Sequence, residues 1–235
     1  MAAGAATGIL HTVFEIPAIL AGILTQISLW SINLRIMGGK SNMPLLKVDT
    51  IFTGLVEKTG MKQSMISLIF GIVIAAIVIS VLYWFFGTEL GASIRATGAN
   101  QNMARAQGIN TSRNVVLGLV VANGLVALSG ALLSQYNSYA EINMGRGAIV
   151  IGLASIIIGE SIFGNIFRNF ALKLLSVSFG AIIYYIVIQF VISVLKIDSN
   201  YLKLLSALIV AVFLAVPHWK KQYFHAKSGK EKTHA

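Results

Sequence analysis

The chain of 235 residues contains no cysteine, three prolines and only eight acidic residues. The absence of cysteine excludes disulfides, thiolate metal sites and cysteine nucleophiles, so the fold cannot depend on covalent links. Charged residues make up only 11% of the sequence, whereas hydrophobic residues make up 56% and the mean hydropathy is +0.80. A soluble globular protein carries more charge and fewer apolar residues. We therefore expect an all-α integral membrane protein.

Long apolar runs recur along the chain. A helix needs about 20 apolar residues to cross the hydrocarbon core. The runs therefore predict about six transmembrane helices within one transmembrane domain, residues 1–219. The fourth run is short and interrupted by glycine, so a broken or partly re-entrant span is the alternative to a full crossing. The runs occupy residues 16–37, 64–86, 114–133, 147–163, 169–195 and 201–219.

Two further segments lie beside these runs. Residues 1–10 are apolar but too short to span, and they lack the basic start and cleavage site of a signal peptide. They are typical of the second half of a helix, so we expect an N-terminal helix that is truncated; a short amphipathic start is the alternative. Residues 38–63 are long enough to form a short helix at the membrane surface, as a docking place for a partner protein or as a lid.

Lysine and arginine are distributed unequally between the two sides of the membrane. The side that holds residues 89–113 and the tail 220–235 carries the larger share, and Asp49, Glu57, Glu141 and Asp198 all lie on the other side. Because positive loops face the cytoplasm, the polar centre and the basic tail are expected there. The net charge of +10 is then explained by cytoplasmic loops and anionic membrane lipid, and we expect no nucleic-acid partner.

The polar centre, GASIRATGANQNMARAQGIN at residues 91–110, predicts two short helices. Thr88 can cap the first helix, which Gly98 would end in a left-handed conformation. Asn100 can cap the second helix, which Gly108 would end in the same way.

The second of these helices exposes apolar and basic side chains among small residues. Met103 and Ile109 are apolar, and Arg105 carries a positive charge. Such a surface is suited to a groove on another protein. An ordinary solvated loop with cytoplasmic arginines is the alternative.

The sequence IRATGANQNMARAQGI, residues 94–109, resembles the cytoplasmic coupling segment of permease subunits in bacterial ABC importers of the branched-chain amino acid and ribose-type permease family. Residues 16–39 and 144–164 are similar to other spans of that family, so the resemblance covers nearly the whole chain. Family members are usually longer at the N-terminus by one or more helices. The residues that match the family's coupling pattern are Arg95, Ala96, Gly98, Asn100, Ala104, Arg105, Gly108 and Ile109.

The resemblance implies a permease subunit of the bacterial cell membrane that forms the pathway for a small solute, with an amino acid favoured and a sugar or nucleoside as the alternative. It implies three kinds of partner: a second permease chain, ABC ATPase subunits and an extracytoplasmic solute-binding protein. The ATPase would bind ATP and Mg and contact the coupling segment, residues 89–112. This chain would bind no cofactor or metal and would not be an enzyme, since neither a G-x-x-x-x-G-K-[ST] nor an H-E-x-x-H motif is present. The coupling residues would be Arg95, Gly98, Asn100, Met103, Ala104, Arg105, Gly108 and Ile109.

Polar side chains within the apolar runs are candidates for the substrate pathway, because placing them against lipid is costly. Structural roles are the alternative: the amides can bond to a neighbouring helix, and the carboxylate can pair with Arg95 or Arg168. A secondary transporter or channel is the rival function class, and it would need charges within the membrane for coupling ions or a filter. The candidates are Ser28, Asn33, Asn123, Glu160 and Gln189.

Overall fold

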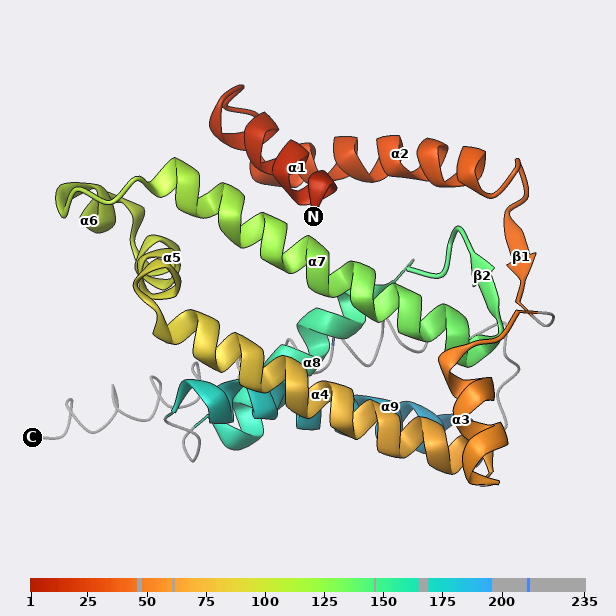
Figure 1. Ribbon diagram of the computed structural model, residues 1–235. Coiled ribbons are helices and arrows are strands. Elements are labelled where there is room, and N and C mark those ends of the chain that lie inside the picture. The colour runs from red at the N-terminus through yellow and green to blue at the C-terminus, as the bar shows by residue number, and fades with distance from the viewer. Residues whose placement is uncertain (46–47, 61, 146, 165–168, 196–210, 212–235) are drawn as a thin grey trace, which may run out of the picture. The chain divides into compact units, whose positions relative to one another are not determined.

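The computed structural model describes residues 1–45, 48–60, 62–145, 147–164, 169–195 and 211 (Figure 1). The chain divides into two units, Met1–Gly145 and Arg146–Ala235, and each is described by itself. The first unit contains α1 (Ala2–Thr12), α2 (Ala18–Ile36), β1 (Asn42–Pro44), α3 (Ile51–Thr59), α4 (Gln63–Gly87), α5 (Glu89–Ala99), α6 (Gln101–Ala106), α7 (Thr111–Asn137) and β2 (Tyr139–Glu141). The second unit contains α8 (Ala148–Phe163) and α9 (Phe170–Leu195).

Four described helices are long and apolar enough to cross a membrane, namely α2, α4, α7 and α9. They confirm four of the predicted spans and the all-α membrane class of the protein. The fourth predicted run forms α8, which is apolar but has only 16 residues. The last predicted run, residues 201–219, and the basic tail, residues 220–235, lie outside the described residues.

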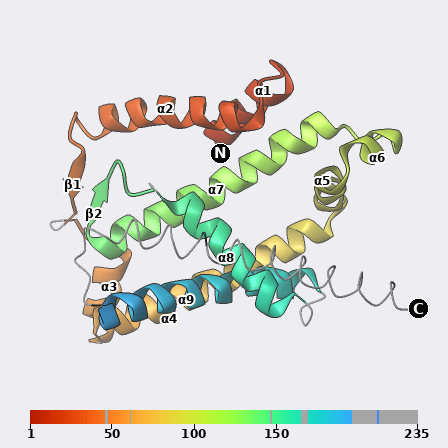
Figure 2. The same cartoon turned by 180° about the vertical axis from the view of Figure 1, so that it is seen from behind.

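The segment at residues 1–10, predicted as part of a helix, forms α1, which packs against α7 through two glycines. A Cβ atom on Gly4 would collide with the backbone of Leu119, and one on Gly8 would lie 2.9 Å from the Cα atom of Val116. Glycines four residues apart let two membrane helices approach this closely. Figure 1 and Figure 2 both show α7 extending from α5 and α6 at one end to β2 and α3 at the other.

A hydrogen bond between buried hydroxyl groups joins α1 to α2. The Oγ1 atoms of Thr7 and Thr25 lie 2.8 Å apart, and Thr7 is 8% and Thr25 is 9% exposed. Both hydroxyls also lie near carbonyl oxygens of their own helices, those of Ala3 and Ala21. The Thr7–Thr25 hydrogen bond fixes the position of α1 along the axis of α2.

Replacing Thr25 by valine is expected to lower the free energy of unfolding by about 0.5–1.5 kcal/mol, the usual range for a hydrogen bond between membrane helices. The measurement is unfolding of the purified protein in mild detergent. Ser28→Ala is the control, because the Ser28 hydroxyl bonds only to the carbonyl of Leu24 in its own helix, at 2.9 Å. Equal destabilisation by the two variants would contradict the interhelical role of Thr25.

The predicted surface helix in residues 38–63 is present as α3. Thr50 and Thr53 form a capping box at its start, and the Oε1 atom of Gln135 in α7 accepts a hydrogen bond from the Ile51 amide at 3.1 Å. Phe52, only 4% exposed, packs edge-on against Phe70 of α4 and Tyr136 of α7. These contacts hold α3 against the ends of two spans.

One pair of short strands was not predicted. β1 and β2 pair antiparallel, with Asn42 opposite Glu141 and Pro44 opposite Tyr139. The pairing joins the segments that follow α2 and α7, which are far apart in sequence. A strand of three residues has no periodicity to detect, so only the tertiary arrangement reveals it.

In the second unit, α8 and α9 pack through small residues from both helices. A Cβ atom on Gly159 would collide with the Ser176 carbonyl group, and one on Gly180 would collide with the Ser155 carbonyl oxygen. Ala154, Ile158 and Tyr184 form the buried core of this pair. The close approach therefore depends on the absence of side chains at the two glycines.

Candidate coupling segment and substrate pathway

The chain turns sharply between α4 and α5, and Thr88 stabilises the turn as predicted. Its Oγ1 atom accepts a hydrogen bond from the Gly91 amide at 3.3 Å, and its hydroxyl donates to the Phe85 carbonyl at 2.6 Å. Gly91 is buried, and a Cβ atom on it would collide with the backbone of Phe85 and Phe86. The N-cap therefore fixes the direction in which α5 leaves the membrane-spanning helix α4.

The prediction that Gly98 ends the first helix is wrong. Helix α5 continues through Gly98 to Ala99, and Gly98 does not adopt a positive φ angle. Asn100 ends the helix instead, with an extended backbone at φ −157°. An extended residue can break a helix by itself, so no left-handed glycine is needed there.

Asn100 also starts the second helix, as predicted. Its Oδ1 atom accepts a hydrogen bond from the Met103 amide at 3.0 Å, which caps α6. At the other end Gly108 has φ +78°, and the Ile109 amide donates to the Ala104 carbonyl at 3.0 Å. The predicted roles of Asn100 and Gly108 are both confirmed.

Helix α6 turns one side toward the rest of the unit and the other away from it. Ala104 is 3% exposed, whereas Met103 is 64% exposed. The Nε atom of Arg105 donates a hydrogen bond of 2.8 Å to the Oγ1 atom of Thr111, at the first residue of α7. Helix α6 is thus held in place on the side of Ala104, and the side chain of Met103 projects outward.

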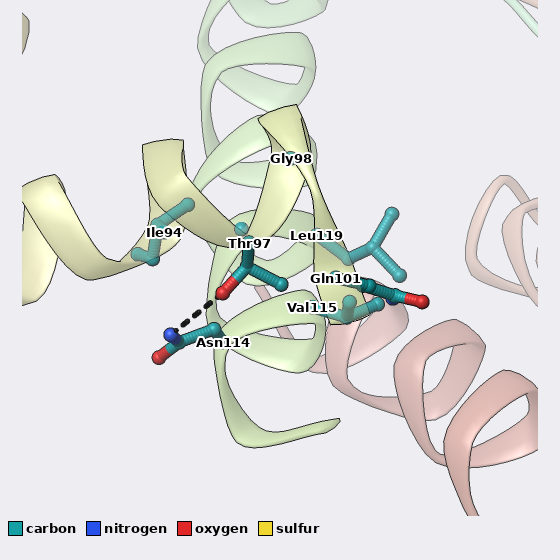
Figure 3. A pocket seen from close by; sticks show the side chains of 8 residues that line it. Ile94, Thr97, Gly98, Gln101, Asn114, Val115 and Leu119 are labelled. Atoms are coloured by element: carbon teal, nitrogen blue, oxygen red, sulfur yellow. Dashed lines mark hydrogen bonds between the residues drawn. The ribbon is translucent and has the colours of Figure 1, made fainter. Parts of the chain in front are cut away.

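A buried polar cluster, which the sequence analysis did not identify, joins α5 to α7 (Figure 3). The Nδ2 atom of Asn114 donates to Ser93 Oγ at 2.5 Å and to Thr97 Oγ1 at 3.0 Å. Asn114 and Thr97 are each 5% exposed. Asn114 is the first residue of a predicted span. A polar residue is common at the end of a span, so its sequence position alone does not predict a buried hydrogen bond.

Asn110 is a second residue whose role was not predicted, although it follows a known sequence signal. Its Oδ1 atom accepts a hydrogen bond from the Arg113 amide at 3.0 Å and caps α7. An asparagine just before an apolar helix is a recognised start signal. Helix α7 consequently begins at Thr111, before the apolar run that predicted it.

A cleft of about 520 Å³ lies between α5 and α7, next to α6. Figure 3 shows Thr97 and Asn114 bonded to each other, with Val115 and Leu119 farther along α7. The walls of the cleft combine aliphatic side chains with amide and hydroxyl groups and carry no charged side chain. The lining residues are Ile94, Thr97, Gly98, Gln101, Asn114, Val115, Gly118 and Leu119.

The candidate pathway residues lie on four different helices. Ser28 and Asn33 are exposed on α2, while Asn123 is half-buried in α7 and bonds to the Leu119 carbonyl of its own helix at 3.0 Å. Glu160 near the end of α8 and Gln189 in α9 are exposed and belong to the second unit. Arg168, an expected partner of Glu160, lies outside the described residues.

Metal-binding side chains do not gather in the part of the chain that the structure describes. No group of three or more histidine, aspartate or glutamate residues there is placed to hold a metal ion. The polar groups that do gather are amides and hydroxyls, which bond to one another and cap helices.

Residues 1–217 match the protein family described as "Branched-chain amino acid transport system / permease component". The chain belongs to this permease family. The permease is 38% identical over 213 residues to the tyrosine transport system permease protein of Clostridioides difficile (strain R20291), a match that covers 91% of this chain and 68% of that protein.

Two further relatives cover less of the permease. An uncharacterized protein of Rickettsia prowazekii (strain Madrid E) is 34% identical over 202 residues, covering 86% of this chain and 69% of that protein. The D-allose transport system permease protein AlsC of Escherichia coli (strain K12) is 29% identical over 113 residues, covering 47% of this chain and 35% of that protein. No solved structure matches the chain.

Family membership confirms the resemblance seen in residues 94–109. The protein is a multi-pass membrane permease component of an ABC transporter, and its function is transport. It is not itself an enzyme, because ATP hydrolysis in such a system belongs to a separate ATPase subunit. As a component of this kind it works with an ATPase and a solute-binding protein.

Proposed function

We propose that the permease carries an amino acid across the bacterial cell membrane and is coupled to its ATPase through residues 95–109. The amino acid is supported by the 38% identity to a tyrosine transport permease over 91% of this chain. A sugar is the second candidate, because the D-allose relative matches 47% of the chain at 29% identity. The broader and stronger match favours the amino acid.

Uptake into proteoliposomes tests the substrate. The permease is reconstituted with its ATPase and solute-binding protein, and the uptake of radiolabelled tyrosine, leucine and allose is compared. We expect ATP-dependent uptake of an amino acid and none of allose. Uptake of allose alone would replace the amino acid by the sugar.

The observation that carries the coupling proposal is the geometry of α6. The helix is capped at Asn100, turned back at Gly108 and bonded to α7 through Arg105, yet it projects Met103 away from the unit. An exposed apolar side chain on a firmly held helix is suited to a cleft in a partner protein. The partner would be the cytoplasmic ATPase, which binds ATP and Mg, and its closure would displace α6.

The remaining partners are proposed from the position of α3 and from the family to which the chain belongs. With α6 in the cytoplasm, α3 lies at the opposite end of α7 and faces the external solute-binding protein. The contacts of Phe52 and Gln135 hold α3 in place for that docking. A second permease chain, identical or related, completes the pathway.

Replacing Arg105 by glutamate is expected to reduce ATP-dependent uptake about tenfold or more, because reversing a charge at a protein interface costs several kcal/mol. Uptake and stimulation of the ATPase are both measured, together with the amount of permease in the membrane. Thr111→Val separates the two effects of this change: it removes the 2.8 Å hydrogen bond to Arg105 and leaves the charge in place, so any loss of uptake in it measures the bond alone. If Arg105→Glu preserves both uptake and ATPase stimulation, the coupling role of α6 is refuted.

A further inference from the structure

The apolar stretch of α2 is the least apolar among the candidate spans. Over 18 residues its mean hydropathy is 1.4, whereas the values for 18-residue stretches of α4, α7 and α9 are 3.0, 2.2 and 2.1. The difference comes from polar residues within the helix, including Gln26, Ser28, Ser31 and Asn33. A polar side chain facing lipid is costly, so these residues indicate that part of α2 faces something other than lipid.

One side of α2 is already occupied by α1. Ala21 and Thr25, four residues apart, are the buried positions of the helix. At 3.6 residues per turn, Ser28 falls close to this same side. The α1 contact therefore accounts for one polar face of α2 and leaves the others open.

A second polar face lies about a third of a turn away from the first. Gln26, Trp30 and Asn33 follow the spacing i, i+4 and i+7, which places their side chains in one row along the helix. All three are exposed, Trp30 by 44%. Ser28 and Asn33, both pathway candidates, are five residues apart and so point in different directions.

The side chains of Gln26, Trp30 and Asn33 are suited to bind a zwitterion weakly, as a transport pathway requires. An amide oxygen can accept a hydrogen bond from an ammonium group, and an amide nitrogen can donate to a carboxylate. The indole of Trp30, between the two amides, can stack on an aromatic ring or bind a cation through its face. The one charge in α2, Arg35, lies on another side of the helix, so the row has no fixed charge to trap the solute.

We propose that the Gln26–Trp30–Asn33 row lines the substrate pathway and that Trp30 favours amino acids with aromatic side chains. This inference rests on the proposed function, since it assigns residues and a substrate class to the same transport activity. The row spans about 10 Å along the helix axis, a length that lets one amino acid contact both amides in turn.

Cysteine scanning tests whether the row faces water, and the native chain has no cysteine to interfere. Gln26→Cys, Trp30→Cys and Asn33→Cys are made in the permease, reconstituted with its ATPase and binding protein, and treated with a membrane-impermeant maleimide. Labelling is expected on the order of tenfold faster at these positions than at the control Leu24→Cys, an exposed apolar position on another side of α2. Equal rates at all four positions, or no labelling of the row, would overturn the inference. Disulfide cross-linking between two copies at Trp30→Cys without labelling would assign the row to a permease–permease interface, which also overturns it.

A second variant tests the selection of side chains. Trp30→Leu is expected to lower the ratio of tyrosine to leucine uptake about threefold to tenfold, the value of one aromatic contact. An unchanged ratio would remove Trp30 from substrate selection. If the complex carries only allose, the proposed substrate and the selection by Trp30 both fail, and the labelling pattern still decides whether the row lines the pathway.

Discussion

Replacing Gly108 by valine is expected to reduce ATP-dependent uptake to the background of liposomes that lack the permease, while the protein still inserts into the membrane. Gly108 has φ +78°, a conformation in which a β-branched side chain is strongly strained. The strain costs of the order of 1–3 kcal/mol, and the short helix α6 has few contacts that could offset it. The turn that aims α6 away from α7 would then rearrange, and Met103 would no longer meet the ATPase.

Gly108→Asn is the matched control, because asparagine tolerates the left-handed conformation although it is similar in size to valine. We expect this variant to keep most of the uptake and of the ATPase stimulation. Membrane levels of both variants are compared by immunoblotting. Equal activity of the valine and asparagine variants would show that the backbone conformation at Gly108 is unimportant for coupling.

Local signals in the sequence predicted most of the helix starts and ends in residues 88–108, because caps are local interactions. Thr88, Asn100 and Gly108 each act on residues within three or four positions of themselves, so residue type and spacing are enough to place them. Gly98 shows the limit of the same reasoning. Glycine permits a left-handed ending but does not force one, and the neighbouring Asn100 ends the helix in an extended conformation instead.

Contacts between distant segments could not be predicted in this way. Asn114 lies 21 residues from Ser93 and 17 residues from Thr97, and its burial depends on how α5 returns against α7. The pairing of β1 with β2 has the same origin. A polar residue in an apolar run therefore signals that a partner exists, and only the fold identifies the partner.

The assignment of pathway residues stays a prediction for a related reason. Helical periodicity was available from the sequence and already separates Ser28 from Asn33, but it does not say which side of α2 is covered. The structure supplies that fact, since α1 buries Ala21 and Thr25. The row of Gln26, Trp30 and Asn33 becomes a candidate only once the side facing α1 is known.

Helix α7 connects the proposed coupling segment to α3. At its first residue, Thr111 bonds to Arg105 of α6, and near its end Gln135 and Tyr136 contact α3. Its 27 residues form one continuous helix. A displacement of α6 by the ATPase would therefore act directly on an element that reaches α3, without passing through a flexible loop.

Replacing Gly159 by leucine is expected to have the largest effect on stability in the second unit. A Cβ atom at this position would collide with the carbonyl group of Ser176, which belongs to the backbone of α9 and cannot rotate away. Overpacking of this kind costs about 1–3 kcal/mol or more, and here it forces α8 and α9 apart along their whole contact. We expect a lower melting temperature in mild detergent and a smaller fraction of monodisperse protein.

Gly152→Leu is the control in the same helix, because no atom lies within 4 Å of a Cβ atom at Gly152. Leucine is a better helix former than glycine, so this variant should be as stable as the native protein. If both leucine variants lose stability equally, the effect arises from added apolar bulk in α8 and not from the close approach of the two helices.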